Sequence, residues 1–270
     1  MQRFQNRSSA WMKRTMYRVA RICIHFGFNP RRFVWSIMGI PDFVRDVFTY
    51  TRATPRHSTF RLRMRDLWPI LYEKRETAGE ARGHYFHQDL WAARKIFQRH
   101  PLTHVDVGSR IDGFVAHVIA FMPVTVIDIR ALRSSIEGLE FIKDDATELH
   151  GFGDNCVDSL SCLHAAEHFG LGRYGDPIAP NGYFKLMKSL QRVLRPGGRL
   201  YFSVPVGRER VEFNAHRVFA VDTVVNTFNE LSLVSFSFVD DEGQLHKDTT
   251  WAETPVYEYA CGLFEFTKSG

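Results

Sequence analysis

The chain has 270 residues, of which 44% are hydrophobic and 24% are charged. This composition excludes a largely disordered protein and suits one domain with an appendage, or two small domains. The charge is uneven, because residues 1–65 hold fourteen Lys and Arg and only two acids, a net charge of +12, whereas the whole chain carries +5. Such a basic segment suits nucleic acid, an anionic membrane surface or an acidic partner, and a solvated basic face is the plain alternative.

The four cysteines are too scattered for a disulfide framework or a structural zinc site. They are Cys23, Cys156, Cys162 and Cys261, and no two form a Cys-x-x-Cys pair. We therefore expect buried thiols in a reducing compartment and predict no metal site. No signal peptide is recognised, and no run approaches the roughly 18–20 apolar residues of a membrane-spanning helix. We expect a cytoplasmic protein that can contact the inner face of a membrane.

The first 65 residues are predicted to be helical. From Ser9 to Phe26, apolar residues recur at spacings of three and four with basic residues between them, which indicates a basic amphipathic helix. Two short helices are expected at 31–38 and 42–50, separated by Gly39-Ile40-Pro41. Such helices can lie in an anionic membrane interface or pack on a domain. We predict a basic helical extension over 1–65 and an α/β domain over 66–270.

Helical and extended patterns alternate in the second part of the chain. Helices are expected at 88–100, 114–122, 182–194 and 218–231, and strands at 104–107, 124–129, 139–142, 157–164, 200–206, 233–239 and 262–267. Alternation of this kind predicts right-handed βαβ units and a mostly parallel sheet. Only a loop separates the last two strands, so they are expected to form an antiparallel hairpin. The predicted fold is therefore a Rossmann-like α/β fold with a seven-stranded sheet.

Polar residues follow the ends of successive predicted strands. Ligands of open parallel sheets bind outside the carboxyl ends of the strands. The candidates at or just beyond the strand ends are Asp106, Gly108 and Ser109 for the first strand, Asp128 for the second, Asp145 and Ala146 for the third, and His164, Glu167 and His168 for the fourth. Asp128 is placed to accept hydrogen bonds from both ribose hydroxyls of an adenosine ligand. A helix cap is the alternative function for this carboxylate.

The segment after the fourth strand carries two groups of candidate residues. The string from His164 to His168 fits the H-x-x-E-H pattern of one class of zinc proteases, but His164 ends a strand and little helix follows it. A general base, His168 or His164 oriented by Glu167, is the preferred interpretation, and a braced loop is the alternative. Substrate contacts are expected from Arg173, Tyr174, Asn214, His216 and Arg217. The two arginines suit a diphosphate, and a hydrogen-bonded loop is the alternative.

Residues 104–206 resemble the class I S-adenosylmethionine-dependent methyltransferases. The resemblance rests on Asp106-x-Gly108, Asp128, Asp144-Asp145-Ala146, Glu167-His168 and the run Val193-Leu194-Arg195-Pro196-Gly197-Gly198. More narrowly, residues 84–219 resemble a bacterial family of unassigned function that is related to these methyltransferases and associated with surface-polysaccharide biosynthesis. The strings that carry this second resemblance begin at His84, Val105, Leu163 and Glu212.

The resemblance implies S-adenosylmethionine as the cofactor. Asp106 and Gly108 would flank its methionine part, Asp128 would hold the ribose, Asp145 and Ala146 would lie by the adenine, and His164 would form the pocket floor. The implied activity is O- or N-methyl transfer to a sugar or glycan precursor of the bacterial cell surface.

One departure from the family pattern supports a different function. Arg110 and Asp112 stand where the family has glycines, which favours a non-catalytic methyltransferase-like scaffold in envelope polysaccharide assembly. Nucleic acid is not expected as a partner, because the basic segment contains no recognisable nucleic-acid-binding module.

Overall fold

The computed structural model describes residues 23–24, 26–250 and 257–270. The chain forms two compact units, Met1–Glu80 and Ala81–Gly270. Residues 66–80, which the sequence analysis assigns to the second domain, therefore group with the first unit. The predicted helix from Ser9 to Phe26 lies almost entirely outside the described residues. Within the described residues, no helix is both long enough and apolar enough to cross a bilayer.

The first unit is built around one long helix, α2 (Pro30–Ala53). The predicted break at Gly39-Ile40-Pro41 is wrong, because the helix runs through Pro41. Pro41 has no amide hydrogen, which removes one helical hydrogen bond. The segment after the helix packs where the break was expected: a side chain at Gly39 would lie 1.8 Å from the carbonyl oxygen of Leu71, and Arg75 donates to the carbonyl of Met38 at 3.3 Å. Two short 3-10 turns follow, η1 (Met64–Asp66) and η2 (Glu73–Arg75).

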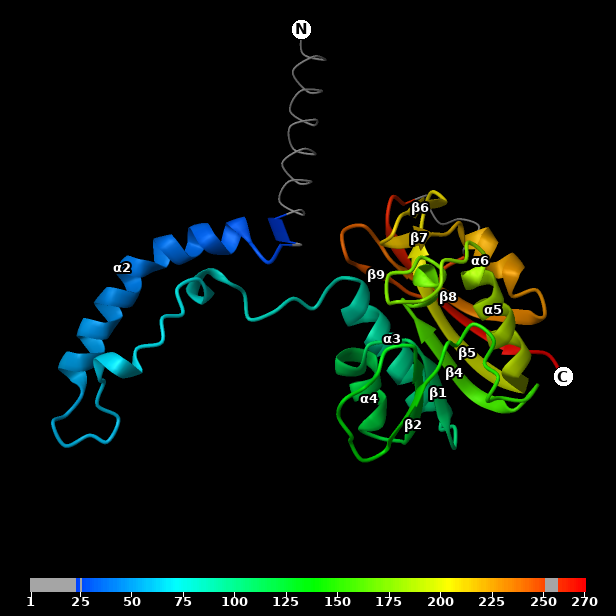
Figure 1. Cartoon of the computed structure of the whole chain (residues 1–270), viewed down its shortest axis with the longest axis horizontal. Helices are drawn as coiled ribbons and strands as arrows, with labels where there is room; N and C mark the ends of the chain where they lie inside the picture. The colour runs from blue at the N-terminus through cyan, green and yellow to red at the C-terminus, as the bar shows by residue number, and fades with distance from the viewer. Residues whose placement is uncertain (1–22, 25, 251–256) are drawn as a thin grey trace, which may run out of the picture. The chain divides into compact units, whose positions relative to one another are not determined.

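The second unit is built on one eight-stranded sheet (Figure 1). Its strand order is β3-β2-β1-β4-β5-β10-β8-β9. The five strands from β3 to β5 are parallel, and β10 pairs antiparallel with both β5 and β8. Their bounds are β1 (His104–Val107), β2 (Val124–Asp128), β3 (Leu139–Lys143), β4 (Val157–Leu163), β5 (Leu194–Val206), β8 (Leu231–Val239), β9 (Leu245–His246) and β10 (Ala260–Lys268).

The sheet has eight strands, one more than the seven predicted from the sequence. All seven predicted strands are present, and the eighth is the two-residue strand β9, which pairs antiparallel with the end of β8. A two-residue strand carries too few residues for an alternating pattern, so its pairing depends on the tertiary fold. The antiparallel hairpin that was expected from the last two predicted strands corresponds to β8 and β10.

Helices cover both faces of the sheet (Figure 1). On one face lie α3 (His84–Arg99), the π-helical turn η3 (Ile111–Val115) and α4 (Ala116–Ile119). On the other lie α5 (Gly182–Val193) and α6 (Val221–Thr227). Alternate strand residues enter the two cores, so Phe202 and Val204 pack toward α5 and α6, whereas Tyr201 packs toward Trp91 of α3.

The loops beyond β4 and β5 carry small elements of their own. The 3-10 turn η4 (Ala166–His168) follows β4, and the antiparallel pair β6 (Arg210–Glu212) and β7 (His216–Val218) follows β5. The predicted helix 218–231 is shorter than expected, because residues 216–218 pair as β7 and the helix begins only at Val221. These elements lie after the carboxyl ends of parallel strands, where a ligand site is expected.

Candidate functional site

A pocket lies at the carboxyl ends of the first four strands. It encloses about 720 Å³ of space, open solvent included, and the residues at the strand ends that line it are Gly108, Ile127, Asp128, Ala146, Leu163 and His164. The chain proceeds from β1 toward β2 and β3 on one side and returns to β4 and β5 on the other. The pocket therefore lies at the point where the strand order reverses, which is the expected ligand position in an open α/β sheet.

Gly108 exposes bare backbone to this pocket. Its φ is +71°, and a side chain there would lie 3.0 Å from the Cβ of Ala165. Glycine is the residue that adopts this backbone region at no steric cost. Its amide donates to the carbonyl of Ile127 at 2.9 Å, which joins the ends of β1 and β2. A ligand can thus approach the main chain closely at this point.

Asp106 does not line the pocket but lies buried beneath it. Its carboxylate accepts hydrogen bonds from the amide of Ser109 at 3.0 Å, from the hydroxyl of Ser109 at 2.6 Å and from the hydroxyl of Ser161. Burial raises the pKa of Asp106 to about 6. Ser109 also accepts from the amide of Leu163 at 3.1 Å and so links the loop after β1 to β4. These two predicted cofactor residues support the pocket floor from below.

Asp128 lines the pocket and is bound by a neighbouring arginine. Its Oδ1 accepts from the amide and the Nε of Arg130 at 2.8 and 3.0 Å, and its Oδ2 accepts from Nη2 at 2.6 Å. The Arg130 guanidinium lies 4.4 Å from the centre of the Tyr174 ring. Arg130 and Tyr174 both line the pocket. The carboxylate that the sequence analysis predicts as a ribose acceptor therefore lines the pocket, but Arg130 uses most of its acceptor capacity.

Asp145 and Ala146 complete the wall that follows β3. Asp145 accepts the amide of Thr147 at 3.0 Å, which fixes the turn, and its amide donates to the side chain of Asp144 at 2.8 Å. Ala146 is buried and apolar, while Asp144 and Asp145 are exposed. All three line the pocket. This wall can place an apolar ring beside Ala146 and polar atoms beside the two acids.

Arg110, which stands where the methyltransferases that the sequence resembles have a glycine, lines the pocket but is paired with a neighbouring acid. Its Nε and Nη2 donate to the two carboxylate oxygens of Asp112 at 3.1 and 2.9 Å. The guanidinium lies 5.2 Å from the Tyr85 ring centre, and the side chain is exposed. Arg110 and Asp112 therefore neutralise one another beside the pocket.

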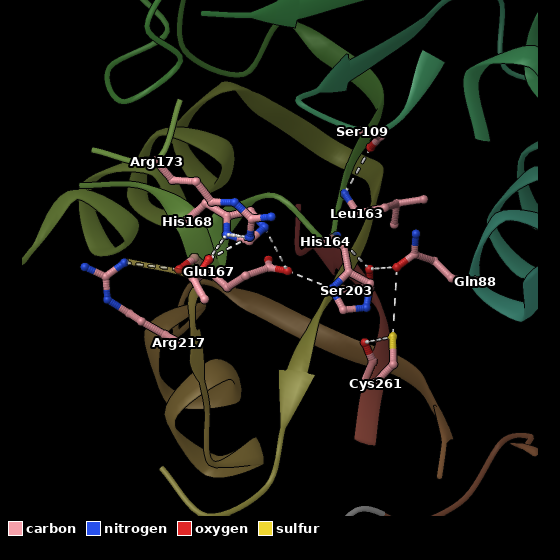
Figure 2. A network of polar contacts seen from close by, with 12 residues as sticks. Gln88, Ser109, Leu163, His164, Glu167, His168, Arg173, Ser203, Arg217 and Cys261 are labelled. Atoms are coloured by element: carbon pink, nitrogen blue, oxygen red, sulfur yellow. Dashed lines mark hydrogen bonds and ion pairs between the residues drawn. The ribbon is translucent and has the colours of Figure 1, made fainter. Parts of the chain in front are cut away.

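His164 and Glu167 form a buried pair. The Nδ1 of His164 lies 2.7 Å from Oε1 of Glu167, and the amide of His164 donates to the carbonyl of Ser203 at 3.0 Å. Figure 2 shows His164 between Glu167 on one side and Cys261 on the other. Burial alone lowers the pKa of His164, but the neighbouring Cys261 and Glu167 outweigh this effect and raise the pKa well above its usual value. Glu167 does not line the pocket.

His168 lines the pocket and has a defined tautomer. Its Nδ1 lies 2.7 Å from the carbonyl oxygen of Ala215, which can only accept, so Nδ1 carries the proton. Burial lowers the pKa of His168, so the ring is neutral near pH 7 and its Nε2 keeps a lone pair. The 3.7 Å from Nε2 to Oε1 of Glu167 is too long for a hydrogen bond. His168 is therefore the side chain best suited to accept a proton in this pocket.

The loop after η4 is held by one acid and one buried arginine. Asp176 accepts the amides of Gly170, Gly172 and Tyr174 at 2.8, 3.1 and 3.2 Å. Arg217 donates to three main-chain carbonyls, those of Glu167 at 3.3 Å, Phe169 at 2.7 Å and Pro180 at 3.2 Å. Because Arg217 is buried and committed to these carbonyls, its place is structural: it positions the loop that carries His168.

The other predicted substrate contacts lie apart from one another. Tyr174 lines the pocket. Arg173 is exposed and donates to the carbonyl of Ala215 at 2.8 Å, beside His168 (Figure 2). Asn214 is exposed, and His216 packs against Tyr259 with ring centres 5.0 Å apart and ring planes tilted by 43°. Of this group, only Tyr174 contributes to the pocket wall.

Sequence reasoning missed several lining residues. Tyr85, Ile129, Arg130, Phe169 and Asp176 line the pocket but were not singled out. Arg130 directly follows the predicted strand 124–129, which is a local signal, whereas Asp176 lies twelve residues beyond the predicted strand 157–164 and has none. Tyr85 precedes the first strand of the sheet and gives no such signal.

The strand order, with three strands on one side of the reversal and an antiparallel strand inserted next to β5, is that of a methyltransferase-like α/β fold. The family model described as "Caenorhabditis protein of unknown function, DUF268" matches residues 119–245. No curated protein matches the chain by sequence.

Solved structures with a similar chain trace include three bacterial methyltransferases. The 1,6-didemethyltoxoflavin-N1-methyltransferase of Burkholderia thailandensis is 16% identical, with 68% of this chain and 79% of that chain covered and a TM-score of 0.47. The N-methyltransferase NodS of Bradyrhizobium japonicum is 14% identical, with 70% and 89% covered and a TM-score of 0.46. An S-adenosylmethionine-dependent methyltransferase of Clostridium acetobutylicum is 11% identical, with 69% and 92% covered and a TM-score of 0.45.

Proposed function

We propose that this protein is an S-adenosylmethionine-dependent O- or N-methyltransferase. The observation that carries the proposal is the pocket at the strand-order reversal, where bare backbone at Gly108 and the carboxylate of Asp128 face the same space. The residues fit an adenosine cofactor. Asp128 would hold the ribose, Ala146 and Asp145 would contact the adenine, and Gly108 would let the methionine part approach the main chain.

The cofactor would supply an electrophilic methyl group on a sulfonium, and the protein would align a nucleophile with it. Methyl transfer needs little covalent help, so positioning provides most of the rate. His168 would accept the proton of an acceptor hydroxyl or amine at Nε2, while its Nδ1–H stays bound to the carbonyl of Ala215. The loop held by Asp176 and Arg217 keeps His168 at the pocket wall.

The acceptor that we propose is a sugar or glycan precursor of the cell surface. This part rests on the sequence resemblance of residues 84–219. A bacterial source is not a condition of the proposal, because the matching family model is described for Caenorhabditis. Exposed Arg173, next to His168, is available for an anionic group of the acceptor.

Titration calorimetry with S-adenosylmethionine and S-adenosylhomocysteine tests the cofactor. Micromolar binding is expected for the unaltered protein, and Asp128→Asn should weaken it by about 10–100-fold, since a hydrogen bond to a charged group contributes about 1.5–3 kcal/mol. Asp154→Asn, an exposed acid outside the pocket, is the matched control and should bind normally. Absence of binding to a folded protein would rule out the methyltransferase.

The role of His168 has its own test. Asn in its place can still donate to the carbonyl of Ala215 but lacks the Nε2 lone pair. His168→Asn should keep cofactor affinity and lower methyl transfer about 100-fold or more. Unchanged transfer would remove His168 as the proton acceptor.

A non-catalytic methyltransferase-like scaffold in envelope polysaccharide assembly is the second candidate. The favouring observation is the ion pair between Arg130 and Asp128, which occupies both oxygens of the carboxylate. The scaffold function predicts no cofactor binding in the calorimetric titration, whether or not Arg130 is present.

We further propose a cytoplasmic protein that binds anionic lipid peripherally through its first unit. Phe33, Ile37, Ile40, Val44 and Phe48 recur at helical spacing on α2 and are all exposed. An apolar stripe beside basic residues suits a membrane interface. Phe33→Ser with Phe48→Ser should reduce co-sedimentation with phosphatidylserine vesicles, whereas Phe184→Ser, an exposed residue of the second unit, should not. Equal sedimentation of both variants would exclude the stripe as the anchor.

A further inference from the structure

Three residues far apart in the sequence meet beside the pocket floor. His84 begins α3, His164 follows β4 and Cys261 lies in β10. One side-chain nitrogen or sulfur atom from each lies within 4.8 Å of the other two. The imidazoles of His84 and His164 are stacked, with ring centres 5.3 Å apart and an interplanar angle of 11°.

The Nε2 atom of His164 and the sulfur of Cys261 form few hydrogen bonds with other residues. Among the described residues, the Nε2 of His164 is buried and has no hydrogen-bond partner of good geometry, and Cys261 is the polar side chain that faces it. Cys261 is fully buried, and within the described part of the chain the hydrogen bonds of its sulfur are long, 3.9 Å to Oε1 of Gln88 and 3.8 Å to the carbonyl of Gly262. An unpartnered buried nitrogen costs free energy, so its position needs a physical reason.

His164 and His84 each form a further hydrogen bond outside the three-residue cluster. Glu167 lies 2.7 Å from Nδ1 of His164, and the main chain of Tyr259 forms a hydrogen bond with His84. A histidine that binds a metal usually donates its second ring nitrogen to a carboxylate or a carbonyl, which orients the ring and fixes the tautomer. Both histidines have this second contact.

We propose that His84, His164 and Cys261 bind one Zn²⁺ ion. Two imidazoles and one thiolate are ligands that zinc prefers, and three protein ligands leave a fourth position for water or a substrate group. On binding, the thiol of Cys261 releases its proton to solvent and the sulfur forms the bond to the metal. The charges then balance: Zn²⁺ and the thiolate sum to +1, and the carboxylate of Glu167 beside His164 cancels it.

This metal site goes beyond the proposed methyl transfer and gives His164 and His168 different roles. His164 belongs to the metal, with Glu167 as its positioning residue, and His168 remains the proton acceptor. No metal site was expected from the sequence, because no close spacing of Cys and His residues indicates these three ligands. The ligands here are separated by 80 and 97 residues and meet only through the sheet.

Cobalt(II) is the probe for this site, because a thiolate bound to it gives a sulfur-to-cobalt charge-transfer band and four-coordinate cobalt absorbs strongly in the visible. The purified full-length chain is stripped with a chelator and titrated with cobalt(II), then with Zn²⁺ in competition. We expect one equivalent to produce both features and Zn²⁺ to abolish them.

Three variants assign the ligands. Cys261→Ala should lose the charge-transfer band, whereas Cys162→Ala, which is equally buried but points into the opposite core, should keep it. His84→Gln, at a half-buried position, should keep the fold and bind cobalt at least tenfold more weakly. Far-ultraviolet circular dichroism confirms folding of each variant.

Two results would overturn the site. One is the absence of a charge-transfer band from folded unaltered protein. The other is a band that survives in Cys261→Ala, because it would then come from Cys23, Cys156 or Cys162. Cofactor titration of the metal-free protein is a separate readout, so loss of the metal proposal leaves the methyltransferase proposal intact.

Discussion

Arg130 holds both carboxylate oxygens of Asp128 within the candidate cofactor pocket, at 3.0 Å from Nε to Oδ1 and 2.6 Å from Nη2 to Oδ2. The same oxygens are the ones that ribose hydroxyls would use. Arg130 also contacts the ring of Tyr174, 4.4 Å from its centre. Cofactor binding therefore requires Arg130 to share the carboxylate or to move away from it.

Arg130→Ala should raise the affinity for S-adenosylmethionine, because it removes a competitor for Asp128. The pair is half-exposed, so the gain is up to about fivefold. Arg133→Ala removes the same charge from the neighbouring loop and should leave the calorimetric affinity unchanged. If Arg130→Ala instead weakens binding, Arg130 is a cofactor contact and no competitor.

The raised pKa of Asp106 predicts that the free energy of unfolding depends on pH. Burial raises its pKa from 3.8 to about 6, so the folded state binds the proton more tightly than the unfolded state. The contribution of this proton binding to the free energy of unfolding is complete below about pH 4 and is lost as the pH rises through about 6. Relative to Asp106→Asn, the free energy of unfolding should fall by up to about 1.4 kcal/mol per pH unit in this range.

Urea unfolding of both proteins between about pH 4 and 7 measures this difference. Asp112→Asn is the control: Arg110 lowers the pKa of that exposed carboxyl, so the difference in the free energy of unfolding between the unaltered protein and Asp112→Asn should not fall in this range. A difference between unaltered protein and Asp106→Asn that stays constant with pH would contradict the raised pKa.

Gly108→Ala should both destabilise the protein and impair the pocket. The backbone has φ +71°, which costs a residue with a Cβ about 1–2 kcal/mol, and the new methyl would lie 3.0 Å from Ala165. Gly175→Ala has the same kind of backbone, φ +87°, but its methyl meets no atom within 4 Å. Thermal unfolding should show a loss for both variants and a larger one for Gly108→Ala, and only Gly108→Ala should lose cofactor affinity.

Arg217→Met should loosen the loop that carries His168. Methionine keeps an apolar stem but leaves the carbonyls of Phe169 and Pro180 without their donor, and we expect a loss of about 2–4 kcal/mol in the free energy of unfolding. Limited proteolysis should then cleave between residues 170 and 180. Arg208→Met, at an exposed position, should change neither result. A stable, protease-resistant Arg217→Met would return Arg217 to the list of substrate contacts.

The sequence by itself determined the parallel half of the sheet. Buried apolar runs end at Val107, Asp128 and Leu163 within one residue of the predicted ends, because a short buried strand has a local signature. The polar residues that follow these strands were found for the same reason, since strand ends of a parallel sheet share one edge. Gly108, Asp128 and His168 belong to this group.

Only the tertiary structure decided which of these side chains face the pocket. Asp106 and Asp128 both lie at the carboxyl ends of parallel strands. Asp106 is buried and hydrogen-bonded to Ser161, whereas Asp128 lines the pocket. Alternation along a strand does not specify which face a ligand will use. The meeting of His84 with His164 and Cys261 depends on α3 and β10 packing at one edge of the sheet. Periodicity reports which residues are buried, and contacts across 80 or more residues are set by the packing of whole elements.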